Sequence, residues 1–315
     1  MARFEISSAK ILRHPDQILR LKEGGVPSIL NVEVDLSESC NARCPHCDFP
    51  NHYKSCMDAE TCVQTVARLK TWGTQAVVLT GGGEPTVHPN WQGIAKDWSR
   101  HFQLGMYTNG IKLDLAPCEA AFRWVYVSLD APDEKAWSEN KGVDPGLFRK
   151  VLANIEAASY YTTVGVGFLI GEDNVGRVEE MAILGLSTNC AYVHFRPRFP
   201  VSNNDWESDA RVRLGRVATM PRVSVAWERF EHGWHWTRPY SLCWASMFIR
   251  QIDTEGSVYA CPTTRWLRKV GHVSDFIPLT RPLPVIPACR ELCRGDGLNR
   301  VLNPIMRAGP HDCFV

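Results

Sequence analysis

The sequence predicts an α/β fold in which parallel strands and helices alternate to form a partial (βα)6 barrel similar to a TIM barrel. Short apolar runs alternate with amphipathic stretches from residue 29 onward, which is typical of repeated βα units. Glycine-rich and polar segments follow several of these apolar runs, where parallel βα folds carry their functional loops. The chain has 315 residues, 44% of them hydrophobic, so it can bury a large core.

The barrel is predicted to occupy residues 30–198. Its six strands are expected at residues 30–36, 76–80, 102–108, 124–129, 164–170 and 192–196. Helical spacing of apolar residues predicts the intervening helices at residues 58–72, 91–101, 115–122, 145–160 and 175–186. Residues 1–29 precede the first strand as an N-terminal extension.

The alternation of strands and helices stops after residue 198. Residues 199–242 are rich in tryptophan and polar residues, and we expect them to bridge two domains, with a helix near residues 205–220 and a strand near residues 223–227. Residues 243–315 contain five cysteines and little periodicity. This composition favours a small C-terminal domain organised by a metal group rather than by a large core.

Composition disfavours several classes of protein, although it does not exclude a long nucleic acid as a partner. A formal net charge of +1 provides no broad positive field for long nucleic acids. No apolar run is long enough to span a membrane, and residues 1–21 lack the apolar core of a signal peptide. Twelve cysteines in such a chain are more typical of metal ligands, where they cluster, than of disulfides. We therefore expect a cytoplasmic protein that does not bind membranes.

Three cysteines follow the first predicted strand with the spacing CxxxCxxC. They are Cys40, Cys44 and Cys47. Iron-sulfur clusters are usually held by four thiolates, so a 4Fe-4S cluster on three leaves one iron open to a substrate or cofactor. The triplet therefore predicts a catalytic cluster rather than a structural one.

A glycine run, Gly81-Gly82-Gly83-Glu84-Pro85, follows the second predicted strand. Glycines let the backbone approach a ligand closely, and Glu84 adds a negative charge. Each motif alone is a weak signal, because CxxxCxxC can be part of a zinc site and many glycines only form turns. Together, each in a loop after a strand, they resemble the radical S-adenosylmethionine (SAM) superfamily.

The resemblance implies a cofactor and a reaction. In that family SAM chelates the open iron, an electron from a donor such as flavodoxin or ferredoxin cleaves it, and the 5′-deoxyadenosyl radical abstracts a substrate hydrogen. Glu84 is expected to bind the methionine ammonium of SAM, a charge-assisted hydrogen bond of about 1.5–3 kcal/mol. The residues expected to contact SAM are His46, Gly81, Gly82, Gly83, Glu84, Asn109, Ser128 and Asp130. Ser128 and Asp130 are also common in turns and helix caps.

The C-terminal cysteines resemble the auxiliary-cluster extensions called SPASM and twitch. These extensions open with a cysteine, a gap, a glycine, four residues and a second cysteine. The same order is present here, with twelve residues between Cys243 and Gly256 and four between Gly256 and Cys261. The opening normally forms a β-hairpin, which residues 249–253 and 257–260 predict. Five cysteines after residue 242 are fewer than the roughly seven of SPASM domains, which favours a twitch-like domain with one 4Fe-4S cluster. The expected ligands are Cys243, Cys261, Cys289 and Cys293, with Cys313 as an alternative. A structural zinc on the same thiols is the competing interpretation.

The sixth predicted strand carries polar side chains on one face. Tyr192, His194 and Arg196 alternate along it. If this face lines the barrel, Arg196 is the best candidate to bind a substrate carboxylate or phosphate. The alternative is a solvated edge of an incomplete barrel.

For the function, we expect a radical SAM enzyme acting on a small molecule such as an amino sugar, a nucleoside or an amino-acid derivative. About thirty residues precede the first strand, too few for the leader-binding domain of many peptide-modifying relatives. The auxiliary cluster would accept an electron or anchor the substrate. Alternatives are a peptide substrate, a nucleotide or modified base, and a non-enzymatic iron-sulfur or zinc protein.

Overall fold

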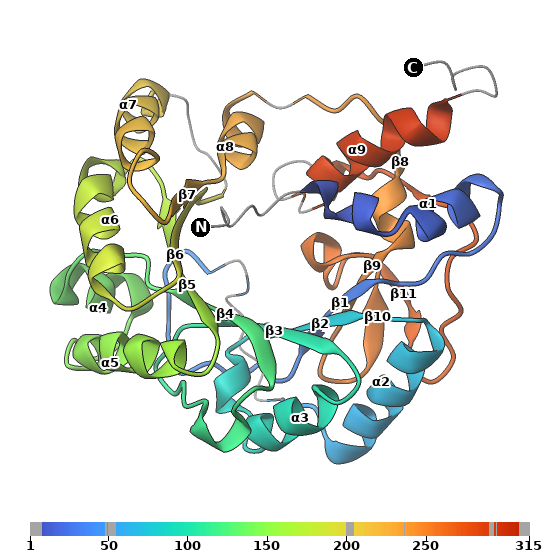
Figure 1. The fold of residues 1–315 in the computed structure, drawn as a ribbon, viewed down its shortest axis with the longest axis horizontal. Helices are drawn as coiled ribbons and strands as arrows, with labels where there is room; N and C mark the ends of the chain where they lie inside the picture. Colours follow the sequence, from blue (N-terminus) through green and yellow to red (C-terminus); the bar gives the residue numbers. More distant parts are fainter. Residues whose placement is uncertain are drawn as a thin grey trace.

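The computed structural model describes residues 8–47, 49, 55–199, 205–235, 237–289, 293 and 295–308. One ten-stranded sheet, in the order β11-β10-β9-β1-β2-β3-β4-β5-β6-β7, forms the centre of the molecule. Its strands from β1 to β7 are parallel to their neighbours, and the sheet curls so that helices α2 to α7 cover its outer side (Figure 1). The predicted α/β fold with a barrel-like parallel sheet is confirmed.

The elements of the barrel follow the predicted order. The strands are β1 Asn31–Asp35, β2 Ala76–Thr80, β3 Gln103–Thr108, β4 Phe122–Ser128, β5 Thr163–Ile170, β6 Tyr192–Pro197 and β7 Val223–Val225. The helices are α2 Ala59–Thr71, α3 Trp91–Trp98, α4 Glu134–Lys141, α5 Leu147–Ser159, α6 Val178–Ser187, α7 Glu207–Val217 and α8 Trp227–Trp234.

Apolar burial and capping explain these elements. Val32, Val34 and Val77 are fully buried, and each contributes about 1.5–3 kcal/mol through the water it excludes. The side chain of Asp58 accepts a hydrogen bond from the backbone N–H of Thr61 at 2.7 Å and thereby caps α2.

Two predicted details differ from the structure. The helix expected at residues 115–122 is only a 3₁₀ turn, Ala116–Cys118, because Ala120 has a left-handed backbone (φ 60°) and Phe122 already enters β4. Helix α4 was not predicted, because its mostly polar sequence carries little apolar periodicity. It begins at the cap Asp133, whose side chain accepts from Ala136 N at 2.9 Å.

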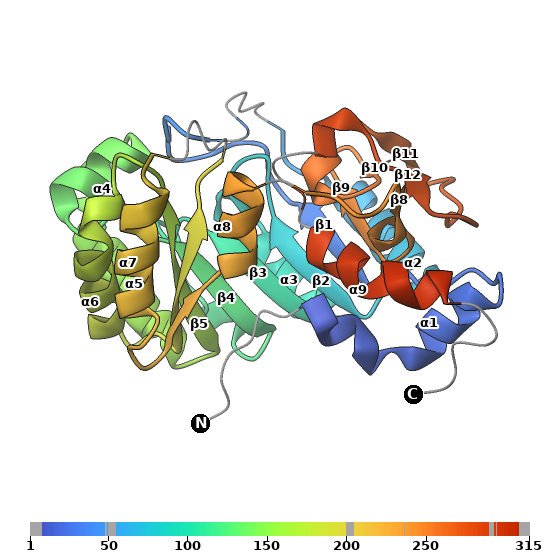
Figure 2. The same cartoon turned by 90° about the horizontal axis from the view of Figure 1, so that it is seen from above.

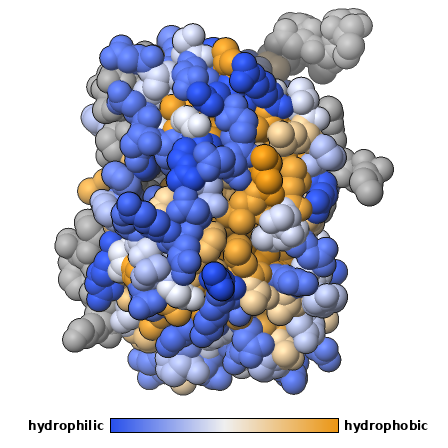
Figure 3. Space-filling model, turned by 90° about the vertical axis from the view of Figure 1, so that its left-hand side faces the viewer, coloured by the Kyte–Doolittle hydropathy of each residue, from blue (hydrophilic) through white to orange (hydrophobic). Residues whose placement is uncertain are grey.

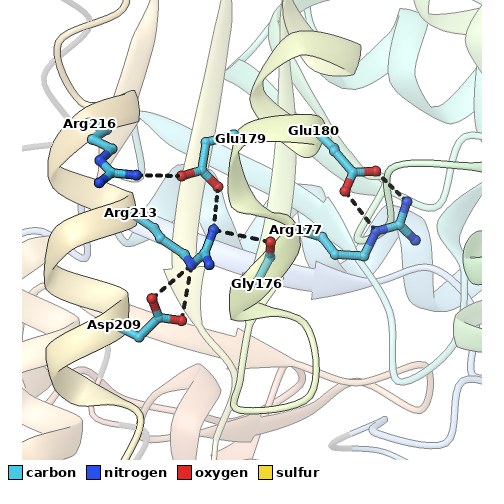
Figure 4. Close-up of polar contacts among 7 residues, drawn as sticks. All are labelled: Gly176, Arg177, Glu179, Glu180, Asp209, Arg213 and Arg216. Carbon is cyan, nitrogen blue, oxygen red and sulfur yellow. Dashed lines mark hydrogen bonds and ion pairs between the residues drawn. The ribbon is translucent and has the colours of Figure 1, made fainter.

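Residues 205–235 add a seventh unit to the barrel. Strand β7 pairs in parallel with β6, and ion pairs join α7 to α6 (Figure 4). Arg213 lies 2.8 Å from Asp209 and 3.1 Å from Glu179, which Arg216 approaches at 3.8 Å. Each such pair stabilises the fold by less than about 1 kcal/mol, but together they fix how α7 lies on α6. The face seen from this side is mostly hydrophilic, with a band of apolar side chains (Figure 3).

The C-terminal part of the chain continues the sheet on its other side. The predicted hairpin is present as β9 Ile249–Ile252 and β10 Ser257–Tyr259, and β9 pairs in parallel with β1. Strand β11 Lys269–His272 completes this edge, and β8 Leu242–Cys243 pairs separately with β12 Leu283–Pro284.

The remaining helices form a second layer beside the hairpin. Helix α1 Pro15–Lys22 and helix α9 Asp296–Arg307 lie on one side of the molecule in both ribbon views (Figure 2). They enclose a small apolar core separate from that of the barrel, made of Ile11, Ile18, Leu21, Leu30, Met247, Phe248 and Leu302. No helix in the described part of the chain is long and apolar enough to cross a membrane.

Candidate active site

The cysteine triplet lies in the loop after β1. Cys40, Cys44 and Cys47 are half-buried free thiols. Burial, opposed by a hydrogen bond from the backbone N–H of Ala42 and assisted by the charges of Glu84, Cys44 and Cys47, raises the pKa of Cys40 to about 11. Because the charges of Cys44 and Cys47 act on the pKa of Cys40, the three thiols lie in one region. A metal centre bound there would favour their thiolate forms.

The glycine run packs directly against this loop. The backbone N–H of Glu84 donates to the carbonyl of Ser39 at 2.9 Å, and that of Gly83 donates to Ser37 at 3.1 Å. A Cβ atom on Gly83 would lie 2.1 Å from the Ser39 oxygen, so only glycine fits there. The two motifs thus form a single surface at the carboxyl edge of β1 and β2.

Glu84 is a buried link between β2 and β3. Its Oε1 accepts hydrogen bonds from Thr86 N (3.1 Å), Thr86 Oγ1 (2.7 Å) and Thr108 Oγ1 (2.6 Å). Its Oε2 accepts from the backbone N–H of Asn109 at 2.7 Å. Burial raises the pKa of Glu84, although these donors oppose the shift. Because Oε2 accepts one bond, it retains a lone pair for a ligand cation.

Asn109 connects the triplet loop to β3. Its Nδ2 donates to Oδ1 of Asn41 at 2.7 Å. The Nδ2 of Asn41 is buried and has no hydrogen-bond partner among the described residues. A buried amide donor without a partner costs about 1–3 kcal/mol, so Asn41 is suited to donate to a bound ligand.

Asp130 and Lys141 form a buried ion pair beside the triplet. Lys141 Nζ lies 2.5 Å from Asp130 Oδ2, and Asp130 Oδ1 accepts from Leu169 N at 2.9 Å. Burial disfavours the charged form of Lys141, but Asp130 and Cys44 outweigh it and raise its pKa. The carbonyl of Lys141 also accepts from Arg43 N at 2.7 Å, so the end of α4 packs on the triplet loop. Ser128 is half-buried at the end of β4, and His46 is exposed in the triplet loop.

The four predicted auxiliary cysteines gather in the C-terminal part of the structure. They come from β8, from the turn after β10, from the 3₁₀ turn Pro287–Cys289 and from the segment before α9. Burial, together with the charges of Cys243, Cys261, Asp296 and Cys289, raises the pKa of Cys293 to about 12. Across the described residues, no three His, Cys, Asp or Glu side chains surround a point where one metal ion could bind. Cys313 lies outside the described residues.

Strand β6 lies inside the sheet, between β5 and β7, and is not an edge. Tyr192 and His194 are buried, and the Arg196 guanidinium lies 4.7 Å from the centre of the Tyr126 ring and 5.9 Å from that of Tyr107. Burial, together with the charges of Arg196 and Arg229, lowers the pKa of His194 to about 3, so His194 is neutral at pH 7.

Glycines on β5 make room for two of these aromatic rings. A Cβ atom on Gly165 would lie 2.2 Å from Cζ of Tyr192, and one on Gly167 would lie 1.8 Å from Oη of Tyr126. The rings of Tyr192 and Tyr126 therefore lie across the inner face of β5. Together with the Arg196 guanidinium, they form this part of the inner wall of the barrel.

Comparison with known proteins identifies the family. Residues 34–184 match the model of the Radical SAM superfamily, within which both motifs of the candidate site fall. Residues 34–184 form a radical SAM domain. The chain is therefore an enzyme, and the family of this domain uses SAM and a 4Fe-4S cluster.

Curated relatives of this radical SAM enzyme include maturases by name. The mycofactocin maturase MftC of Mycobacterium ulcerans is 24% identical over 259 residues, which cover 76% of this chain and 70% of that protein. MftC of Mycobacterium tuberculosis is 26% identical over 265 residues, covering 76% of this chain and 66% of MftC. The chain thus spans about two thirds of the length of these relatives.

Solved structures share the fold. SuiB of Streptococcus suis bound to S-adenosylmethionine gives a TM-score of 0.63 at 13% identity and covers 85% of this chain and 69% of SuiB. SuiB bound to its precursor peptide SuiA gives 0.62 at 13% identity, covering 91% of this chain and 70% of SuiB. A structure of anSMEcpe with bound AdoMet gives 0.59 at 16% identity, covering 79% of this chain and 76% of that chain.

Sequence reasoning missed two residues of this radical SAM enzyme's site. Asn41 lies within the triplet, where a polar residue between two predicted ligands was the available signal. Lys141 lies at the end of α4, which was not predicted, so nothing placed its ammonium beside Cys44.

Proposed function

We propose that this protein is a peptide-modifying radical SAM enzyme whose SAM-binding 4Fe-4S cluster is held by Cys40, Cys44 and Cys47. The observation that carries the proposal is the packing of the two motif loops, with Glu84 N bonded to Ser39 O at 2.9 Å. When bound, the cluster and SAM supply the radical chemistry by which the family removes a hydrogen atom from a substrate.

Several residues of the chain suit the groups of SAM. Oε2 of Glu84 can accept from an ammonium, and Nδ2 of Asn41 can donate to a ligand oxygen. Lys141 adds a buried positive charge next to the thiols, and Asp130 holds it in place at 2.5 Å. Glycines of the run leave backbone groups accessible to the ligand. The roles of His46 and Ser128 rest on the family resemblance.

We assign a second 4Fe-4S cluster to Cys243, Cys261, Cys289 and Cys293. A structural zinc requires all four sulfur atoms within about 2.3 Å of one ion. A four-iron cluster distributes its thiolates over separate irons, so they need not converge on a point. The thiols of Cys243, Cys261 and Cys289 all act on the pKa of Cys293, which supports a common site for the four. An external reductant, such as flavodoxin or ferredoxin, would supply electrons to the enzyme.

A peptide is the substrate class that the comparisons favour, over the small molecule expected from the sequence. Four of the curated relatives are maturases by name, whereas two others are named as a nucleotide dehydratase and a probable GTP cyclase. SuiB has been solved with a precursor peptide. In the barrel, Arg196 can bind a carboxylate of the peptide while the rings around it cover apolar side chains. Tyr192 and neutral His194 would offer hydrogen bonds from the same strand.

The first test concerns the clusters. Anaerobic reconstitution should load about eight irons and eight sulfides per chain, and dithionite with SAM should yield 5′-deoxyadenosine. The Cys44→Ala protein should retain about four irons and cleave no SAM. An intact, fully loaded protein that leaves SAM uncleaved would rule out the proposed chemistry.

The second test concerns the substrate. Extract of cells grown on deuterated amino acids is separated by size, and each fraction is incubated with the loaded enzyme. We expect deuterium in 5′-deoxyadenosine with the peptide fraction. If only the low-mass fraction transfers deuterium to 5′-deoxyadenosine, the substrate is a small molecule and the peptide proposal is wrong.

A further inference from the structure

Arg250 is a buried arginine on β9 whose hydrogen-bonding capacity is only partly used. Its side chain is 1% exposed. Nη1 donates to the backbone carbonyls of Ser246 and Ile249, the latter at 2.5 Å. Nε and Nη2 are buried and have no hydrogen-bond partner in the described part of the chain. Leaving buried donors of a charged group unsatisfied costs several kcal/mol, so an anionic partner is expected.

Arg250 lies next to the chain segment of one proposed cluster ligand, because its Nη1 donates to the carbonyl of Ser246, three residues after Cys243. Cys261 and Cys243 favour its charged form, whereas burial opposes it and lowers its pKa to about 10. Arg250 therefore stays charged at neutral pH. Its guanidinium also lies 5.3 Å from the centre of the Phe276 ring, which closes one side of it.

The other fully buried arginine in this region has a different partner. Arg265 pairs with the carboxylate of Asp35 at 2.6 Å. For Arg250, the groups among the described residues that favour its charged form are the thiols of Cys261 and Cys243 and not a carboxylate. Four thiolates around an iron-sulfur core leave a net negative charge, which increases by one when the cluster takes up an electron. A fixed positive charge beside it therefore stabilises the reduced state more than the oxidised state.

We propose that Arg250 is the counter-charge of the auxiliary cluster and raises its reduction potential, so that the cluster accepts an electron more readily. This rests on the cluster assigned above to Cys243, Cys261, Cys289 and Cys293. The competing interpretation is structural, in which Arg250 only ties the 3₁₀ turn Trp244–Met247 to β9 through the two carbonyls.

The experiment isolates the auxiliary cluster in the full-length chain. Cys40, Cys44 and Cys47 are replaced by alanine, and R250Q or R250K is added to that protein. The potential is measured by a dithionite titration followed by electron paramagnetic resonance. Arg268→Gln is the matched control, because Arg268 is a half-buried arginine of the same region whose exposed hydrogen bond to the Pro284 carbonyl is 2.6 Å long.

We expect R250Q to disfavour reduction at least about tenfold, which is 59 mV for a one-electron couple. R250K, which keeps the charge, should shift the potential less, and the Arg268 control should not shift it, because solvent screens that charge. Equal potentials for R250Q and its parent, at equal iron content, would overturn the inference and leave the cluster assignment intact.

Iron and zinc analysis distinguishes a failure of the cluster assignment from a failure of the role proposed for Arg250. About four irons in the parent protein support the cluster, whereas zinc or no metal would overturn both the assignment and the inference. If R250K loads iron and R250Q does not, the charge is needed for cluster binding, which supports the inference. If neither loads, the structural interpretation holds and the inference fails.

Discussion

Replacing Arg265 by methionine should destabilise the protein in a manner that depends on pH. Arg265 Nη2 lies 2.6 Å from Oδ1 of Asp35, and the two side chains are 2% and 0% exposed. The pair joins β1, five residues before Cys40, to the turn four residues after Cys261. It is thus a direct link between the loops that carry the two sets of cysteines.

The magnitude follows from the burial of the pair. Removing one partner of a buried ion pair costs about 3–5 kcal/mol, because the other charge remains without compensation. For a chain of 315 residues that corresponds to a decrease in Tm of about 5–8 °C. Thermal unfolding of the loaded protein under anaerobic conditions measures it.

The pH dependence comes from Asp35. Burial raises the pKa of Asp35 to about 7, Arg265 opposes the shift, and Glu33, Asp253 and Glu38 add to it. A carboxyl whose folded-state pKa is raised binds more protons in the folded protein than in the unfolded chain. Stability from this group is therefore present below about pH 4 and is lost as the pH rises toward 7.

Without Arg265 the pKa of Asp35 rises further. The carboxyl is then neutral at pH 6, so R265M should be nearly as stable as wild type there and much less stable at pH 8.5. The double variant D35N/R265M should recover most of the loss at pH 8.5. Equal losses at both pH values, or single-variant losses that simply add in the double variant, would refute this reasoning.

Three further changes have defined outcomes. Gly167→Ala places a Cβ 1.8 Å from a buried tyrosine hydroxyl and should cost about 1–3 kcal/mol in thermal unfolding, whereas Gly176→Ala, with nothing within 4 Å, should be neutral. Glu84→Gln should weaken SAM binding about tenfold by calorimetry while iron content stays unchanged; unaltered affinity would exclude its role. Lys141→Met leaves Asp130 buried without its partner and should lower the free energy of unfolding by about 3 kcal/mol, which K141M/D130N should largely restore.

The sequence alone predicted the fold class, which the structure confirms, and it singled out both sets of cysteines as proposed cluster ligands. Alternating apolar runs define βα units because each strand and helix buries its own face, which is a local property of the chain. The triplet, the glycine run and the spacing from Cys243 to Cys261 are likewise local. Their chemistry depends on residue type and short spacing, which a single sequence displays directly.

Only the tertiary structure decided which distant side chains meet. Asp35 and Arg265 are 230 positions apart, and Asn41 reaches Asn109 across 68. In the sequence Arg250 is an ordinary residue of a predicted strand, whereas the fold buries it and bonds it to the carbonyl of Ser246, three residues after Cys243. Such pairs depend on strand register, on the curl of the sheet and on exclusion of water. None of these is encoded in the spacing of residues along the chain, so burial and charge compensation became visible only in the folded protein.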